Sequence, residues 1–168
     1  MARYAAFLRG INVGGTRITN EKLRAPFAEL GFENVETFRA AGNVIFDAPR
    51  KPAAKEIEQQ LAKDLGFTKA VTFIRTAKEM RELAAADPIP RRAEQKLHVM
   101  FLLGKPTAKV LEFATKSDPL ALGPKELFWG PAGRMTDSEI DLKAMEKLVG
   151  PWTMRTKGTI DEIAARYF

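Results

Sequence analysis

A short pattern that occurs twice in the first half of the chain constrains the fold more than any other feature. Residues 30–32 read Leu-Gly-Phe and precede the run Val-Glu-Thr-Phe-Arg at 35–39, and residues 65–67 also read Leu-Gly-Phe and precede the similar run Val-Thr-Phe-Ile-Arg at 71–75. Glycine readily takes the left-handed conformation that ends a helix, and an apolar residue after it can pack on the last helical turn. Each copy of the pattern therefore predicts a helix, a glycine cap and a strand, in that order.

The segments around these two copies complete the predicted order of elements. Residues 2–8 are mostly apolar and are expected to form a strand, and Thr19 is a suitable N-cap for the helix that follows. Pro26 lies inside this helix and is expected to kink it or to delay its start. A turn then separates two short strands, 35–39 and 43–47, which predicts a hairpin. The resulting order β-α-β-β-α-β is that of a ferredoxin-like repeat.

The second half of the chain repeats this outline. Ser/Thr-x-x-Glu capping boxes are expected to start three helices, at Thr76, Thr136 and Thr159. The predicted fold class is α+β, with two ferredoxin-like repeats packed together, residues 1–90 and 91–168, each carrying an additional helix. The elements expected in the second repeat are strand 96–103, helix 106–116, short strands 120–122 and 127–129, helix 137–149, strand 152–155 and a final helix from residue 159.

The first strand of each repeat predicts that both faces of its sheet are covered. Strands 2–8 and 97–103 are apolar at both alternating positions, with His98 as the exception. Such a pattern is typical of a strand buried on both faces. Packing of the two repeats would cover the second face, and so would dimerisation, so a monomer and a homodimer are both left open. A ligand that lies across an open sheet is then less expected, and the RNA-recognition signature Lys/Arg-Gly-Phe/Tyr-Gly/Ala-Phe is absent.

Composition and charge exclude several kinds of site. The 168 residues include no cysteine and one histidine, which excludes disulfides, thiol chemistry and cysteine-ligated metals. We therefore expect neither a metal nor a cofactor, and we interpret His98 as a core or rim residue. No apolar stretch approaches the roughly 18 residues of a membrane span, so the protein is expected in the cytoplasm, away from membranes. The formal net charge of +6 favours a small anionic ligand or nucleic acid as partner.

The glycine-rich stretch between the first strand and the first helix is the best candidate for a site. It carries two arginines, and backbone N–H groups before a helix N-terminus favour a phosphate or a carboxylate. Two nucleotide-binding motifs do not match, because Thr16 and Arg17 stand where a P-loop needs Lys and Ser/Thr, and Asn12 stands at the second glycine of the dinucleotide motif. The structural alternative is a tight turn that needs a positive φ at Gly14 or Gly15. The candidate ligand-binding residues are Arg9, Gly10, Asn12, Gly14, Gly15, Thr16, Arg17 and Asn43.

The predicted hairpin turn offers a second candidate. Arg39, Gly42 and Asn43 combine a charge with an amide, and the alternative is a turn in which Gly42 and Asn43 supply backbone freedom. This turn and the glycine-rich stretch can lie at opposite ends of a ferredoxin-like sheet, so the sequence alone does not place them together. Binding of a phosphate-bearing anion without catalysis is the favoured function. The alternatives are an enzyme in which Arg9, Asn12 and Asn43 polarise a substrate, a structural or dimerisation module, and an RNA or DNA binder.

Three segments of the chain carry a resemblance to a known family. Residues 7–15 (Phe-Leu-Arg-Gly-Ile-Asn-Val-Gly-Gly), residues 30–32 and residues 42–46 (Gly-Asn-Val-Ile-Phe) resemble the bacterial family known as domain of unknown function 1697. The resemblance spans nearly the whole chain and implies two ferredoxin-like repeats. It implies no catalytic residues, because no activity is established for the family. The chain departs from the family pattern at 138–140 (Ser-Glu-Ile) and at 155–159 (Arg-Thr-Lys-Gly-Thr).

Overall fold

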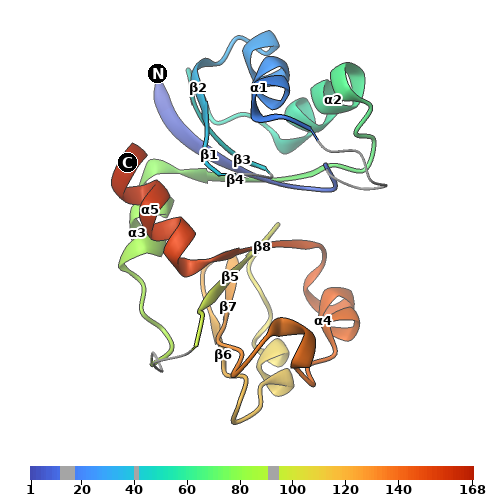
Figure 1. Cartoon of the computed structure of the whole chain (residues 1–168), viewed down its shortest axis with the longest axis vertical. Coiled ribbons are helices and arrows are strands. Elements are labelled where there is room, and N and C mark those ends of the chain that lie inside the picture. Colours follow the sequence, from blue (N-terminus) through green and yellow to red (C-terminus); the bar gives the residue numbers. More distant parts are fainter. Residues whose placement is uncertain (12–17, 40–41, 91–94) are drawn as a thin grey trace. The chain divides into compact units, whose positions relative to one another are not determined.

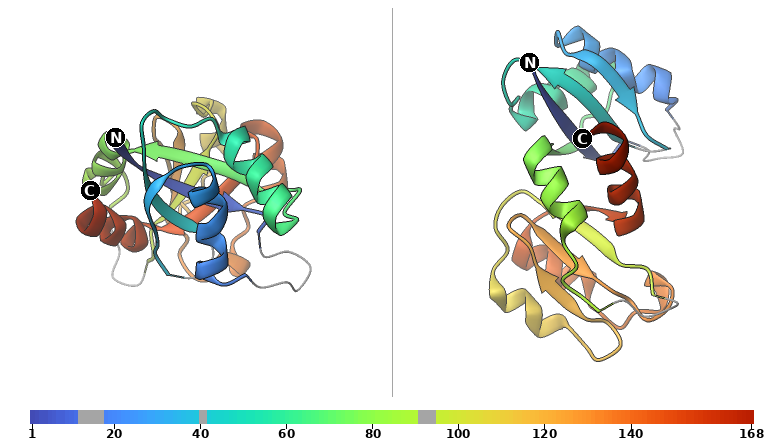
Figure 2. Two further views of the ribbon diagram at one scale, coloured as in Figure 1. Left: turned by 90° about the horizontal axis from the view of Figure 1, so that it is seen from above. Right: turned by 90° about the vertical axis from the view of Figure 1, so that its left-hand side faces the viewer.

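The computed structural model describes residues 1–11, 18–39, 42–90 and 95–168. The chain forms two compact units. Unit 1 contains Met1–Glu82 together with Ile163–Phe168, and unit 2 contains Leu83–Glu162. Figures 1 and 2 show the elements of each unit.

Unit 1 is built on a four-stranded antiparallel sheet of order β2-β3-β1-β4. Helices α1 and α2 lie on one face of this sheet (Figure 1). The elements follow one another as β-α-β-β-α-β, which confirms the predicted ferredoxin-like order. Their bounds are β1 (Ala2–Arg9), α1 (Asn20–Glu29), β2 (Glu33–Thr37), β3 (Asn43–Ala48), α2 (Ala54–Leu65) and β4 (Val71–Thr76).

The core of unit 1 lies between the sheet and its two helices. Phe46 of β3 is at its centre and stacks on Phe32, with ring centroids 4.7 Å apart. Tyr4 of β1 faces this core, while Ala5 and Phe7 point to the other face and are also buried. The prediction that this strand is covered on both faces is therefore confirmed. Each large apolar side chain removed from water in this way stabilises the fold by about 1.5–3 kcal/mol.

Local signals place the ends of the helices in unit 1. The Thr19 hydroxyl accepts a hydrogen bond from the Lys22 backbone N–H at 3.2 Å, as expected of an N-cap. Gly31 has a φ of 82°, and the Phe32 N–H donates to the carbonyl of Phe27 as the chain folds back onto the helix. Pro26 lies within α1 without delaying its start, so that part of the prediction was wrong.

Unit 2 repeats the sheet with the order β6-β7-β5-β8, again fully antiparallel. The fold class is therefore α+β with two similar four-stranded sheets, as predicted. Helices α3 (Ala77–Ala85) and α5 (Lys157–Tyr167) directly follow β4 and β8 and are the additional helices. The other elements are β5 (His98–Leu102), the 3₁₀ helix η1 (Ala108–Phe113), β6 (Leu120–Leu122), β7 (Glu126–Trp129), the 3₁₀ helix η2 (Met135–Asp137), α4 (Leu142–Val149) and β8 (Trp152–Thr156).

Two of the three predicted capping boxes are wrong. The pair Thr76 and Glu79 forms its box, with reciprocal hydrogen bonds of 2.8 and 3.2 Å. Helix α4 begins after Asp141, whose carboxylate accepts from the Ala144 N–H at 3.0 Å, and not at Thr136. Helix α5 begins two residues earlier than expected, because the hydroxyl that accepts the capping hydrogen bond is that of Thr156.

The segment before α4 contacts a buried carboxylate. Asp118 is buried, and its carboxylate accepts hydrogen bonds from the Ser138 hydroxyl at 2.9 Å and from the Ala132 N–H at 3.2 Å. The Ser138 hydroxyl in turn accepts from the Ile140 N–H. Ser138 therefore contacts Asp118 outside the helix, and α4 is shorter than the sequence pattern predicts. The helix predicted over 106–116 is also shorter, and it is the 3₁₀ helix η1.

No helix in the described ranges is both long enough and apolar enough to span a membrane.

His98 provides a direct test of the buried environment in unit 2. Its side chain is 7% exposed, and its ring centroid lies 6.0 Å from that of Trp129. Burial lowers the pKa of His98 below the usual 6.5, and the charge of Lys96 acts in the same direction. Since His98 is the single histidine of the chain, its imidazole NMR signals can be assigned without ambiguity. We expect a titration midpoint below 6.5.

The same shift makes the stability of the protein depend on pH. Between the two pKa values the unfolded chain binds a proton at this position and the folded chain does not, so the free energy of unfolding should fall as the pH drops through 6.5 toward the folded pKa. Denaturant titrations of the wild type and of His98→Gln should show a shallower decline for the variant. A midpoint at or above 6.5, or equal slopes for both proteins, would contradict this account.

Candidate functional site

The strand register of unit 1 brings the two sequence candidates to the same end of the sheet. Strands β1 and β3 are antiparallel, with Phe7 opposite Asn43. The Leu8 N–H donates to the Gly42 carbonyl at 2.9 Å. The residues at which β1 ends therefore lie next to the β2–β3 hairpin turn. We call this region the exit end of β1, comprising the described residues 9–11, 19–20, 38–39, 42–43 and 69–70.

Gly10 shapes the backbone where the chain leaves β1. Its φ is 81°, a conformation that side-chain-bearing residues rarely adopt. A Cβ atom at this position would lie 2.7 Å from the carbonyl oxygen of Lys69, in the turn between α2 and β4. Only glycine lets these two backbone segments approach so closely. Gly10 is thus required by the structure whether or not a ligand binds nearby.

The hairpin turn is held against both neighbouring segments. Gly42 has a φ of 88°, and a Cβ atom there would lie 3.0 Å from the Leu8 carbonyl oxygen. Arg39 has a φ of 57°, and its carbonyl accepts a hydrogen bond of 3.1 Å from the side-chain amide of Asn20, the first residue of α1. The start of α1, the hairpin and the end of β1 are therefore connected by specific contacts.

Asn43 closes the hairpin through its side chain. It is 3% exposed, its Nδ2 donates to the Phe38 carbonyl at 3.0 Å, and the Phe38 N–H donates to the Asn43 carbonyl at 3.1 Å. Asn43 lies in an extended strand, so the expected backbone freedom is needed at Gly42 but not at Asn43. In this hairpin Arg39 also has a left-handed backbone conformation, which the sequence pattern did not predict.

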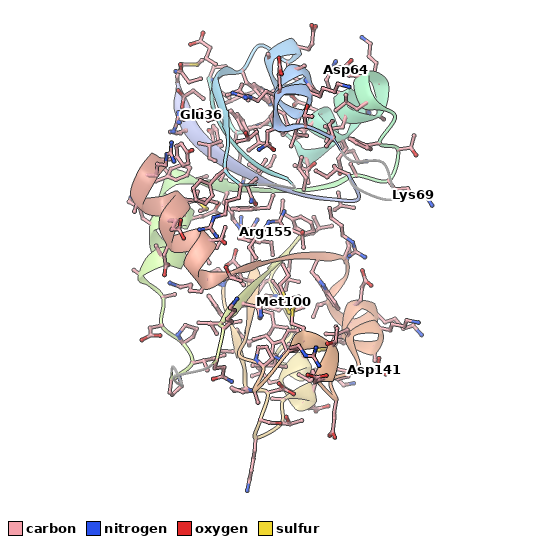
Figure 3. All side chains as sticks on the ribbon, in the orientation of Figure 1. Glu36, Asp64, Lys69, Met100, Asp141 and Arg155 are labelled. Atoms are coloured by element: carbon pink, nitrogen blue, oxygen red, sulfur yellow. The ribbon has the colours of Figure 1, made fainter. Side chains whose placement is uncertain are left out.

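Basic residues from three separate segments lie at the exit end of β1. Arg9 is half-buried at the end of β1, and Arg39 is exposed, with its guanidinium carbon 5.3 Å from the centroid of the Phe38 ring. Lys69 is exposed in the turn before β4, as Figure 3 shows. At the opposite end of the sheet, Arg3 is paired with the carboxylates of Glu36 and Asp47. Lys69 was missed in the sequence because its place depends on strand pairing.

Five of the predicted site residues fall outside the described part of the chain. They are Asn12, Gly14, Gly15, Thr16 and Arg17. They connect the exit end of β1 to the N-cap of α1, because the described chain stops at Ile11 and resumes at Ile18. Within the described ranges, no group of three or more His, Asp or Glu side chains could hold a metal ion.

Comparisons with known proteins agree with this description of the fold. The model of a family described as "Protein of unknown function (DUF1697)" matches residues 1–128. A solved structure, that of the conserved bacterial protein SP0830 from Streptococcus pneumoniae, is similar with a TM-score of 0.75 and 24% sequence identity. The match covers 98% of this chain and 97% of that one, and it shows a shared fold. No curated protein matches the chain.

Proposed function

The chain belongs to the DUF1697 family of proteins of unknown function, and we propose that it binds a small phosphate-bearing anion at the exit end of β1. The observation that carries the proposal is that the backbone segments of Arg9, Arg39 and Lys69 are neighbours at the exit end of β1, where Gly10 approaches the Lys69 carbonyl. Arginine and lysine side chains donate charge-assisted hydrogen bonds to phosphate oxygens. A phosphate offers several oxygens and can therefore interact with more than one of these side chains.

The start of α1 adds to the attraction for an anion. The first backbone N–H groups of a helix have no partner within the helix, and the helix dipole places partial positive charge there. In this proposal Arg9 donates a charge-assisted hydrogen bond to the phosphate. Gly14, Gly15, Thr16 and Arg17 remain candidates from the sequence alone, since they lie outside the described residues. Asn43 holds the hairpin in place beneath the site, since its amide donates to Phe38. That engagement makes the enzyme hypothesis, in which Asn43 polarises a substrate, less well supported.

A thermal-shift experiment tests the proposal with defined probes: pyrophosphate, ADP and a short single-stranded oligonucleotide. At a concentration about 100 times its Kd, a ligand stabilises the folded state by about 2.7 kcal/mol, which raises Tm by about 5–10 °C for a chain of this size. We expect at least one probe to produce such a shift, and we expect the double variant Arg9→Ala/Arg17→Ala to abolish it.

The matched control removes the same charge from the opposite end of the sheet. Arg50 and Lys55 are exposed and lie between β3 and the first turn of α2, away from the exit end of β1. The variant Arg50→Ala/Lys55→Ala should keep the full shift. If both double variants lose the thermal shift to the same extent, net charge alone attracts the probes. If no probe shifts the Tm of the wild type, the proposed site is refuted. A shift with the oligonucleotide alone would favour nucleic-acid binding.

A further inference from the structure

Unit 2 contains a groove that is separate from the exit end of β1. It lies between the 3₁₀ helix η1 and helix α4, has a volume of about 330 Å³ and opens to solvent. Its lining residues are Lys109, Glu112, Phe113, Ala144, Lys147 and Leu148. The volume is at the lower end of the range of about 300–1,000 Å³ found for small-molecule sites.

The wall of the groove formed by α4 combines a small residue with an exposed apolar one. Ala144 and Leu148 are four residues apart and so lie on the same helical face, next to Lys147. Leu148 remains 36% exposed. The short side chain of Ala144 leaves room that a larger residue would fill. An exposed apolar surface of this kind on a folded protein often marks a binding site.

The wall formed by η1 connects the groove to the hydrophobic core. Phe113 is half-buried and packs against the buried cluster that contains Trp129 and Met145. An apolar ligand in the groove would therefore extend an existing hydrophobic surface. The two lysines lie on opposite walls, Lys109 on η1 and Lys147 on α4. Neither lysine belongs to the ion pairs found among the described residues.

We propose that this groove binds a small amphiphilic anion, with an apolar body against Phe113, Ala144 and Leu148 and a carboxylate or sulfonate between Lys109 and Lys147. The charge of the lining selects the head group: two ammonium groups outnumber the single carboxylate of Glu112. Glu112 disfavours a ligand with several negative charges, so a monoanion fits better than a phosphate ester. This site is independent of the proposed phosphate site in unit 1.

The test is a fluorescence titration with anilinonaphthalene sulfonate followed by displacement with octanoate. We expect the native protein to enhance the fluorescence of the probe and octanoate to reverse the enhancement. Octanol, which has the same chain without the charge, should displace the probe about tenfold less well. The double variant Lys109→Ala/Lys147→Ala should weaken octanoate binding by about tenfold, in line with two solvent-exposed charge contacts.

Two further variants separate this groove from other binding surfaces. Lys105→Ala/Lys116→Ala removes two exposed lysines that flank η1 outside the groove, and it should bind octanoate like the wild type. Ala144→Leu keeps a strong helix former but fills the groove, and it should abolish displaceable binding with an unchanged circular dichroism spectrum. Probe fluorescence that octanoate does not reverse, or equal losses in the two lysine variants, would overturn the proposal. So would full binding by a folded Ala144→Leu protein.

Discussion

Gly10→Ala is expected to lower the free energy of unfolding by about 2–5 kcal/mol. The positive φ contributes about 1–2 kcal/mol, because an L-residue with a side chain is strained there. The new methyl group would also meet the Lys69 carbonyl oxygen at 2.7 Å, closer than a real contact allows. Displacing packed backbone in this way costs a further 1–3 kcal/mol or so. Both penalties fall on the connection between β1 and the turn before β4.

Gly66→Ala is the matched control for this substitution. Gly66 has a φ of 74° at the C-cap of α2, yet apart from its chain neighbours no heavy atom lies within 4 Å of the position of its Cβ. It should therefore show the conformational penalty alone, about 1–2 kcal/mol. Chemical denaturation of both variants measures the difference. If the two substitutions lower the free energy of unfolding by the same amount, the close approach between Gly10 and Lys69 does not restrict the fold.

Asp161→Ala is expected to destabilise the protein by about 2–3 kcal/mol, because it removes the carboxylate that neutralises a buried lysine. The Lys157 side chain is 3% exposed, and its ammonium donates to Asp161 at 2.6 Å and to the Ala84 carbonyl in the last turn of α3 at 2.9 Å. Breaking a fully buried pair costs about 3–5 kcal/mol. The estimate is lower here because the Asp161 side chain is 38% exposed and water can partly replace it.

Lys157→Met distinguishes an uncompensated charge from lost packing. Methionine keeps the aliphatic part of the side chain and removes the ammonium, so no buried charge remains and Asp161 can turn to solvent. We expect a change in unfolding free energy within about 1 kcal/mol of the wild type. Thermal and denaturant unfolding of both variants provides the measurement. A larger loss in Lys157→Met than in Asp161→Ala would show that packing around the aliphatic chain outweighs the charge.

Several predictions that depended on a few neighbouring residues were confirmed by the structure. The glycine after each helix of unit 1, the hydroxyl of Thr19 and the box at Thr76 act within one helical turn, so their effect can be read from a few consecutive residues. The two failed boxes, at Thr136 and Thr159, compete with neighbouring polar groups. Asp118 accepts a hydrogen bond from Ser138, twenty residues away, and Asp141 caps the helix in place of Thr136.

The candidate site also combines features that the sequence predicts with contacts that depend on the tertiary structure. The sequence alone predicted a glycine-rich connection that begins at Arg9, two β-α-β-β-α-β repeats, and strands buried on both faces. These features can be predicted because glycine content, charge and the alternation of apolar residues are local properties of the chain. The meeting of Gly10 with Lys69, and of β1 with the hairpin at Gly42, was decided by the tertiary structure. Gly10 and Lys69 are 59 positions apart in the sequence, and Leu8 and Gly42 are 34 positions apart. Only the register of antiparallel strands, which is set by the burial of whole sheet faces, places them side by side.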